Sequence, residues 1–354
     1  MKIKDLNIVF CLLIFVIYVS SCRNKEEKPV PVSINKKGFF VVNEGNYTWG
    51  NSSLSFYDEI NDKFYPDIFY DANAVPLGDV AFSMTVRNNK CYIVVNNSGL
   101  IYIVNADDLK YIGKITGLNS PRQIVIVNDT LAYVSDLYDT RIAKVNLLNN
   151  TISGYINIGH STEKMLFSSG KIFITCWSYG NLVYSIDALT GVKLDSAVVG
   201  KQPNSIVNDI NGNLWVLCDG GFTGSTYGEE NATLWCLNNS NLDEIKHFTF
   251  PQIQSSPTHL NINGAGDSLY FINNDIFQMS INDNNMPINP IIISSGKNFY
   301  SMAVHTHSNE IIVADAKNYV ANGEVMVYSK SGQLKKSFAT GVNPGWVEIY
   351  DMTY

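Results

Sequence analysis

A short sequence pattern recurs seven times along this chain. Each copy is a turn rich in glycine, serine, asparagine or proline followed by an apolar run, as in Gly159 to Met165 and Gly200 to Ile206. The apolar anchor residues that align between the copies are Met84, Ile124, Met165, Ile206, Leu260, Met302 and Val347. They follow one another at intervals of 40 to 45 residues, with one longer interval of 54. A repeat of this length predicts one structural unit per copy.

The segments between the anchors predict β-strands. Short alternating or β-branched runs are separated by clusters of Asn, Asp and Gly, and no stretch has a helical period long enough to predict a helix. About four such strands fit in each unit. One small sheet cannot bury both of its faces unless it stacks on its neighbours, as the blades of a propeller do. The sequence therefore predicts an all-β fold, a seven-bladed β-propeller. A solenoid is the alternative, but it would need capping repeats, which we do not find.

The two ends of the repeat region predict how the ring closes. The last copy, Gly345 to Tyr350, is a single strand, whereas the first blade, beginning at Phe39, lacks its opening strand. We therefore expect the C-terminal strand to complete the N-terminal blade, because this removes the free edge of an open ring. The predicted propeller spans residues 39–354.

The N-terminal segment predicts an export signal. Lys2 and Lys4 precede an apolar run from Leu6 to Val19 that is too short for a spanning helix, so residues 1–21 are expected to be a signal peptide. The sequence Val19 to Cys22 resembles the bacterial lipobox. That resemblance implies that Cys22 is the first mature residue and carries lipid. Plain secretion is the alternative.

The next segment predicts a tether. Residues 22–38 hold the lipidated cysteine and a charged, proline-bearing stretch that cannot bury a core. Lys25 to Glu27 resembles the acidic signal that sends Bacteroidota lipoproteins to the outer face of the outer membrane. This resemblance implies a surface-exposed protein of the outer membrane that contacts the membrane only through its lipid anchor.

Composition excludes two classes of protein. With 45% hydrophobic and 16% charged residues, most of the chain cannot be disordered. Lys and Arg number 25 against 32 Asp and Glu, a net charge of -7 with no basic block, so nucleic acid is not an expected partner. Four cysteines, Cys91, Cys176, Cys218 and Cys236, lie in apolar runs, and a Cys218 to Cys236 hairpin would oppose Cys236 to about Trp215. We expect buried thiols, with a Cys176 to Cys218 disulfide as the alternative.

One face of the predicted ring gathers polar and aromatic residues. In a propeller, the turn before each first strand and the loop after each second strand surround the mouth of the axial channel. The second strands are expected to end at Glu44, Asn96, Asp136, Trp177, Asp219, Asn274 and Asp315. The candidate ligand-binding residues are Tyr47, Trp49, Arg122, Tyr138, Lys164, Trp177, Tyr179, Phe222, Tyr227, His259, Tyr300, Tyr319 and Trp346. Such a set suits a large amphipathic small molecule. Packing between blades is the alternative reading of each ring.

Signs of catalysis are few. The sequence has no Ser, His and Asp arrangement, no nucleophile elbow and no phosphate-binding loop. His305 and His307 could face a metal, but without a third ligand we expect surface histidines on the opposite rim. The chain is therefore expected to be no enzyme and to hold no metal and no cofactor of its own.

Two segments resemble a known family. Ile174 to Ile206 is similar to the bacterial YVTN repeat, and Phe39 to Asp58 resembles the start of the YncE-like surface lipoproteins of Bacteroidota, which include vitamin B12-capturing lipoproteins of gut Bacteroides. The resemblance covers residues 39–354. It implies a protein that captures a large amphipathic cofactor, with cobalamin as the first candidate, and passes it to a TonB-dependent outer-membrane transporter. The alternatives are a surface-layer or adhesion propeller that binds protein or glycan, and an exported hydrolase or dehydrogenase. An enzyme would need a clustered pair of residues with shifted pKa values.

Overall fold

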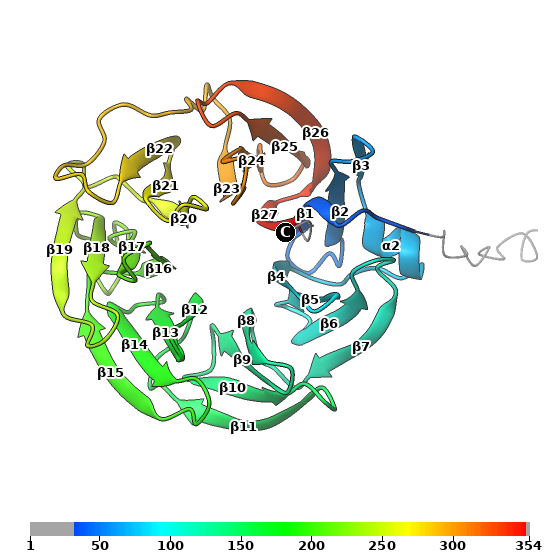
Figure 1. The fold of residues 1–354 in the computed structure, drawn as a ribbon, viewed down its shortest axis with the longest axis horizontal. Helices are drawn as coiled ribbons and strands as arrows, with labels where there is room; N and C mark the ends of the chain where they lie inside the picture. Colours follow the sequence, from blue (N-terminus) through cyan, green and yellow to red (C-terminus); the bar gives the residue numbers. More distant parts are fainter. Residues whose placement is uncertain (1–31, 352–354) are drawn as a thin grey trace, which may run out of the picture.

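Seven small antiparallel sheets surround a central axis in the computed structural model, which describes residues 32–351 (Figure 1). The predicted all-β, seven-bladed β-propeller is confirmed. The predicted signal peptide, the lipidation site Cys22 and most of the tether lie outside the described residues. Within residues 32–351, no helix has the length and apolar character needed to cross a membrane.

The blades follow one another in chain order. The first blade contains β1 (Lys37–Asn43), β2 (Ser53–Asp58), β3 (Lys63–Tyr65) and β27 (Pro344–Asp351); the second contains β4 (Ala81–Arg87), β5 (Lys90–Val95), β6 (Leu100–Asn105) and β7 (Tyr111–Thr116). The third contains β8 (Pro121–Asn128), β9 (Leu131–Asp136), β10 (Arg141–Asn146) and β11 (Thr151–Asn157); the fourth contains β12 (Met165–Ser168), β13 (Lys171–Cys176), β14 (Leu182–Asp187) and β15 (Lys193–Val198). The fifth contains β16 (Pro203–Asn208), β17 (Leu214–Cys218), β18 (Thr233–Leu237) and β19 (Glu244–Thr249); the sixth contains β20 (Thr258–Ile262), β21 (Ser268–Asn273) and β22 (Asp275–Ser280). The seventh contains β23 (Phe299–Val304), β24 (Ile311–Asp315), β25 (Asn322–Tyr328) and β26 (Leu334–Val342), and a short helix, α2 (Ile68–Asn73), connects β3 to β4.

Position within a blade explains the hydrophobic pattern of each strand. The second strand β17 is apolar and buried at every position because neighbouring blades cover both of its faces. The outermost strand β11 alternates between exposed and half-buried residues, since one of its faces meets solvent. All seven predicted anchors lie in the innermost strands, and each is buried. The sequence period therefore located the strands that line the axis.

The C-terminal strand closes the ring as predicted. In Figure 1, β27 lies beside β1 although they come from opposite ends of the chain. They pair antiparallel in regular register from Lys37 opposite Asp351 to Val42 opposite Trp346. Phe40 of β1 packs 5.6 Å from Tyr350 of β27, measured between ring centroids. Closure therefore both satisfies the backbone of β1 and completes an apolar cluster.

The sixth blade departs from the expected four strands. It has three, and the chain after β22 covers the exposed edge without forming a strand. Ile276 exchanges backbone hydrogen bonds with Ile291 and Ile292, and Asp283 donates to the Ser280 carbonyl. Pro287 and Pro290 lie in this segment, and proline cannot donate a hydrogen bond to a sheet. A fourth strand is therefore replaced by isolated contacts.

The four described cysteines are buried free thiols, so the alternative of a Cys176 to Cys218 disulfide is wrong. Cys236 lies opposite Trp215 in the β17 and β18 pair, as predicted. Burial raises the pKa of the Cys176 thiol to about 12 and that of Cys236 to about 11. These thiols serve as small apolar side chains.

His305 corrects another expectation. It lies just after β23 and is buried, whereas His307 is exposed as predicted. The Nδ1 atom of His305 accepts a hydrogen bond of 3.2 Å from the backbone of His307. Its Nε2 atom lies 3.6 Å from Asp351 of the closing strand. The alternation of β23 did not predict this burial, because β27 comes from the far end of the chain.

Candidate functional site at the mouth of the axial channel

The residues two positions before the anchors form a ring at the channel mouth. This mouth ring consists of Phe82, Arg122, Glu163, Asn204, Thr258, Tyr300 and Gly345, one from each blade. All seven line a single hollow of about 250 Å³, together with Glu44, Lys164, Trp177, Asp219 and His259. Because each member comes from a different sheet, the hollow exists only in the closed ring.

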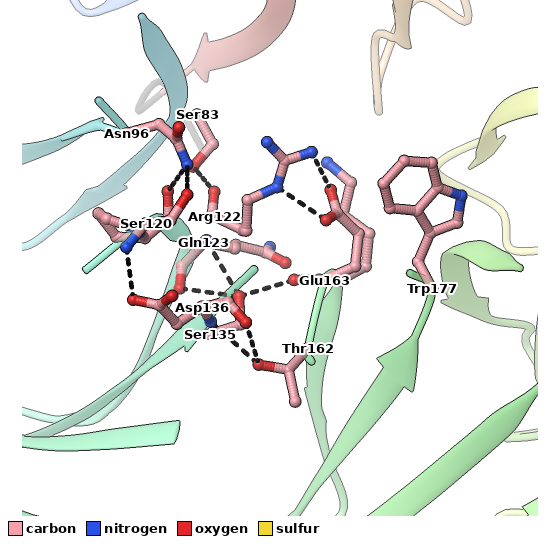
Figure 2. Close-up of polar contacts among 12 residues, drawn as sticks. Ser83, Asn96, Ser120, Arg122, Gln123, Ser135, Asp136, Thr162, Glu163 and Trp177 are labelled. Carbon is pink, nitrogen blue, oxygen red and sulfur yellow. Dashed lines mark hydrogen bonds and ion pairs between the residues drawn. The ribbon is translucent and has the colours of Figure 1, made fainter. Parts of the chain in front are cut away.

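The residues directly before the anchors form a second ring one level deeper: Ser83, Gln123, Lys164, Ser205, His259, Ser301 and Trp346. Some of these residues link neighbouring blades. Ser83 and Ser301 each donate a hydrogen bond of 2.7 Å to a backbone carbonyl of the next blade. The side-chain oxygens of Gln123 and Ser205 accept hydrogen bonds from the next blade's backbone, at 2.7 Å and 3.1 Å. Figure 2 shows the contact between Ser83 and Arg122.

Three members of the second ring depart from this linking pattern. Lys164, His259 and Trp346 line a deeper hollow of about 190 Å³, whose wall includes five of the anchors. Lys164 and His259 also line the mouth hollow, so they lie between the two. The Lys164 ammonium is 3.8 Å from the centroid of the Trp346 ring. These residues belong to the fourth and first blades, which are not neighbours, so the lysine reaches across the axis. Breaks in a local structural rule concentrate at functional sites.

An ion pair holds one side of the mouth. Nε and Nη2 of Arg122 donate to the two carboxylate oxygens of Glu163, at 2.7 Å and 2.9 Å (Figure 2). The Arg122 guanidinium lies over the Phe82 ring, 3.4 Å from its centroid. Only 14% of the Arg122 side chain and 6% of the Glu163 side chain are exposed. This bidentate ion pair fixes both side chains and compensates the charge of Glu163.

A half-buried carboxyl, that of Glu44, lies on the opposite side of the mouth. The Tyr300 hydroxyl donates a hydrogen bond of 3.1 Å to Glu44. Burial raises the pKa of Glu44 to about 7, although the Tyr300 hydrogen bond and the Arg122 charge act in the other direction. Gly345 provides room for this carboxyl, because a Cβ atom there would lie 2.1 Å from a Glu44 oxygen. Near neutral pH, Glu44 is therefore divided between its protonated and ionised forms.

The central basic groups are also perturbed. Burial lowers the pKa of Lys164 to about 8 and that of His259 to about 3, so His259 is neutral at physiological pH. Below them, burial raises the pKa of Glu348 to about 7, and this carboxyl accepts a hydrogen bond of 3.1 Å from the Trp346 indole. The axis thus carries the Lys164 side chain close to two carboxyls, Glu44 and Glu348, that ionise near neutral pH.

The second strands end at the predicted residue in two blades and one residue before it in the other five, but the side chains at these positions have different roles. Glu44, Trp177 and Asp219 line the mouth hollow. By contrast, Asn96 and Asp136 bind the chain of the neighbouring turn, as Figure 2 shows: Asn96 donates to the Ser120 hydroxyl, and Asp136 accepts from the Ser120 backbone. Strand position therefore located these residues, but not their function.

The structure divides the predicted ligand-binding residues into two groups. Arg122, Lys164, Trp177, His259, Tyr300 and Trp346 line one or both hollows. The other group contains the exposed Tyr47, Trp49, Tyr138, Tyr179, Phe222 and Tyr319 and the half-buried Tyr227. We call this second group the aromatic rim; Tyr319 connects to the mouth through an edge contact of 5.7 Å with Tyr300. Ligand contact by either group stays a prediction.

The ligand-binding candidates omitted seven other residues that line the hollow: Glu44, Phe82, Glu163, Asn204, Asp219, Thr258 and Gly345. The repeat alignment contained a signal for Phe82 and Glu163, since both stand two residues before an anchor. Within residues 32–351, no group of three or more His, Cys, Asp or Glu side chains is arranged to hold a metal ion.

The size of the hollow limits what it can enclose. Pockets that bury a drug-sized ligand usually measure about 300 to 1,000 Å³. The mouth hollow, at about 250 Å³, fits a small molecule or one substituent of a larger one. A larger ligand bound here would extend over the aromatic rim.

These features define a seven-bladed β-propeller with a charged, aromatic-walled channel mouth. The chain belongs to the family described as a domain of unknown function (DUF5074), whose pattern matches residues 37–343. No curated protein matches the sequence.

Solved structures share the fold at low sequence identity. A quinonprotein alcohol dehydrogenase-like protein from Bacteroides thetaiotaomicron superposes with a TM-score of 0.70 at 17% identity, covering 90% of this chain and 79% of that one. A protein from Lactobacillus plantarum gives a TM-score of 0.66 at 10% identity, covering 88% and 98%. The Cps50 (Swd1) β-propeller domain of Myceliophteria thermophila gives 0.63 at 9%, covering 84% and 99%. At these identities the similarity shows the fold alone.

Proposed function

We propose that this chain is a surface lipoprotein that captures a large amphipathic cofactor at the channel mouth. Cobalamin is the first candidate, and a TonB-dependent outer-membrane transporter is the partner that would receive it. Lipid on Cys22 would hold the propeller at the outer membrane. The observation that carries the proposal is the aromatic rim around a hollow to which all seven blades contribute.

The exposure of the rim supports binding. Trp49 is 72% exposed and Tyr138 is 76% exposed. Aromatic side chains present a large, rigid surface, and each favourable ring contact adds about 0.5 to 1.5 kcal/mol beyond the burial of area. Exposed apolar surface of this kind is characteristic of interaction sites.

The dimensions favour a ligand larger than the hollow. A flat macrocycle with polar side arms could place one arm in the mouth and cover the surrounding rings. The polar groups of Asn204, Thr258 and Tyr300 line the hollow and could orient such an arm. This arrangement requires binding only, so we propose that the protein is not an enzyme.

One observation favours a second candidate, an exported hydrolase or dehydrogenase. Glu44 and Lys164 line the same hollow, and their pKa values are shifted toward neutrality. Groups that titrate near the working pH suit proton transfer. Turnover of an ester or alcohol that is lost in Glu44→Gln but kept in Trp49→Ala would favour this candidate over capture.

Calorimetric titration with cyanocobalamin, haem and common glycans tests the capture proposal. We expect cyanocobalamin to bind at nanomolar concentration, since scavenging from dilute solution needs about -12 kcal/mol. Trp49→Ala should weaken this binding. Tyr111→Ala is the matched control, because Tyr111 is an exposed ring on the outer strand β7. Absence of cyanocobalamin binding would remove the ligand assignment, and binding of glycan alone would favour an adhesion propeller.

A further inference from the structure

The side chain of Lys164 stands at the junction of the two axial hollows. Its backbone is held by the Thr175 hydroxyl, which accepts a hydrogen bond of 3.0 Å from the Lys164 amide. Its ammonium lies 3.8 Å from the centroid of the Trp346 ring and 5.8 Å from that of Phe82. Rings from two other blades therefore hold this cation on the axis, where a group entering the mouth would meet it.

The Lys164 ammonium has no ion-pair partner in the described part of the chain. No carboxylate oxygen of residues 32–351 lies within 4 Å of it, although Glu163, Glu44 and Glu348 act on it from farther away. Each of these carboxyls has another donor. Arg122 occupies both oxygens of Glu163, Tyr300 donates to Glu44, and the Trp346 indole donates to Glu348.

Lys164 is half-buried, and a cation that loses part of its hydration without gaining an ion-pair partner is costly. Other lysines of this protein avoid that cost. Lys297, for example, forms a 2.6 Å contact with Glu324, and Lys201 donates to the Tyr227 carbonyl at 2.9 Å. Lys164 replaces the serine or glutamine that links blades elsewhere in the second ring, so it also forgoes a structural contact.

We propose that Lys164 binds a carboxylate or phosphate group carried by an aromatic or otherwise apolar ligand. The inference rests on the proposed function in that it assigns a ligand chemistry to the same channel mouth. The group would complete the missing ion pair, and its apolar carrier would contact Phe82 and Trp346. On the mouth ring, Tyr300 adds a hydroxyl, whereas the charge of Arg122 is already paired with Glu163. The hollow is large enough for such a group.

The charges around Lys164 give the site a pH dependence. Its charged and titratable neighbours come from four blades. Glu163 precedes it in the turn before β12, Arg122 belongs to the third blade, Glu44 and Glu348 to the first, and His259 to the sixth. His259 is neutral, and Glu163 is paired with Arg122. Anion affinity should therefore fall as Glu44 and Glu348 ionise near pH 7, and fall further as Lys164 loses its proton above pH 8.

Calorimetry on the full chain with matched probes tests the proposal. The probes are 2-naphthoate, its neutral amide 2-naphthamide, and 2-naphthyl phosphate. We expect either anion to bind the wild type at least roughly tenfold more tightly than the amide at pH 6.5, and this preference to disappear in Lys164→Gln. The anion that binds more tightly shows whether the site prefers a carboxylate or a phosphate group. Lys201→Gln is the matched control, since Lys201 also approaches an aromatic ring on this face, and it should keep the preference.

Outcomes with the wild type keep the test decisive even if Lys164→Gln folds poorly. Equal binding of anions and amide, no measurable anion binding, or anion affinity that does not fall between pH 6.5 and pH 9 would each overturn the proposal. Failure of the two proposals can be told apart. Binding of cyanocobalamin without any anion preference would leave capture intact and reject the Lys164 site. Anion binding through Lys164 without cyanocobalamin binding would support the Lys164 site and reject cyanocobalamin as the captured ligand.

Discussion

The indole nitrogen of Trp177 donates a 2.8 Å hydrogen bond to Asp219, joining the fourth and fifth blades at the channel mouth. Burial raises the pKa of Asp219, and the Trp177 hydrogen bond opposes that rise. The Asp219 carboxylate also accepts a 2.9 Å hydrogen bond from the backbone of Gly221, at the start of a long mouth loop. One indole thus supports both a buried charge and the loop that carries Phe222.

Trp177→Phe should destabilise the protein in a pH-dependent way. The variant keeps an aromatic ring but removes the donor that stabilises the ionised Asp219 carboxylate. We expect a loss of about 1 to 2 kcal/mol at pH 8, and a smaller loss at pH 4, where protonation removes the charge. Urea unfolding at both pH values measures it. A loss of equal size at the two values would show that ring packing, not the hydrogen bond, is responsible.

Glu44→Gln should become stabilising as the pH rises. The pKa of Glu44 is about 7 in the folded chain, above its ordinary value of 4.5, so the folded state holds this proton more tightly than the unfolded state. Stability contributed by the protonated carboxyl is present below pH 4.5 and is lost as the pH rises to about 7. The variant avoids that loss and should gain about 3 kcal/mol relative to wild type between pH 4.5 and pH 8. Tyr300→Phe removes the hydrogen-bond donor to the Glu44 carboxylate, so this variant should lose more stability than the wild type as the pH rises. Thermal melts of the wild type and Glu44→Gln measure this difference. If the two melting temperatures do not diverge as the pH rises, the raised pKa of Glu44 is contradicted.

Deletion of residues 345–354 should severely destabilise the ring. It removes nearly all of β27, exposes the backbone edge of β1, and takes Tyr350 away from Phe40. We expect the melting temperature to fall by more than about 10 °C, or the protein to aggregate. Tyr350→Phe is the control: the Tyr350 hydroxyl is buried without a hydrogen-bond partner, so its removal should leave stability unchanged or improve it. Unchanged melting of the truncated chain would refute closure through β27.

Substitution of the mouth aromatics should separate recognition from packing. Trp49→Ala and Tyr227→Ala should speed ligand release and weaken binding by roughly 1 to 3 kcal/mol. Because Trp49 is 72% exposed, its loss should not lower the melting temperature. Trp346 packs against the core of the first blade, so Trp346→Ala should reduce both binding and stability. Surface plasmon resonance measures ligand release and affinity, and thermal melts on the same samples measure stability. Retained binding in Trp49→Ala would exclude the rim from recognition.

Cys22→Ser should abolish lipid attachment, since the diacylglycerol is expected on the sulfur of this residue. We expect no incorporation of labelled palmitate and release of the protein from the outer membrane. Cys11→Ser is the matched control, because Cys11 lies within the apolar run and should not affect labelling. If Cys22→Ser still partitions with the membrane, the lipobox interpretation is wrong. Replacement of Glu26 and Glu27 by alanine should keep the lipid but reduce protease access on whole cells.

Much of the fold could be predicted because it depends on a local period. The anchors located the innermost strand of every blade, and hairpin geometry placed Cys236 opposite Trp215. The absence of a fourth strand from the sixth blade was missed. The segment with Pro287 and Pro290 prevents that strand, although the spacing of the anchors leaves room for it. The burial of His305 was missed because the covering residues come from another blade.

The candidate site could be predicted only in part. Arg122, Lys164 and Tyr300 were recognised by their position before the anchors, and the structure brings them to one hollow. Glu163 was left out of the ligand-binding set, and its pairing with Arg122 joins two blades, a contact that no single repeat contains. The rim residues were recognised as aromatic loop residues, but loop conformation keeps all seven outside the hollow.

By itself, the sequence determined the number of blades, the strand that closes the ring and the residues that face the axis, because alternation and repeat length act within each blade. Only the tertiary structure decided that Lys164 crosses the axis to Trp346 and that Glu44 has a pKa of about 7. Distance across the ring and loss of water from its centre depend on all seven blades at once. Those properties arise only when the ring is closed.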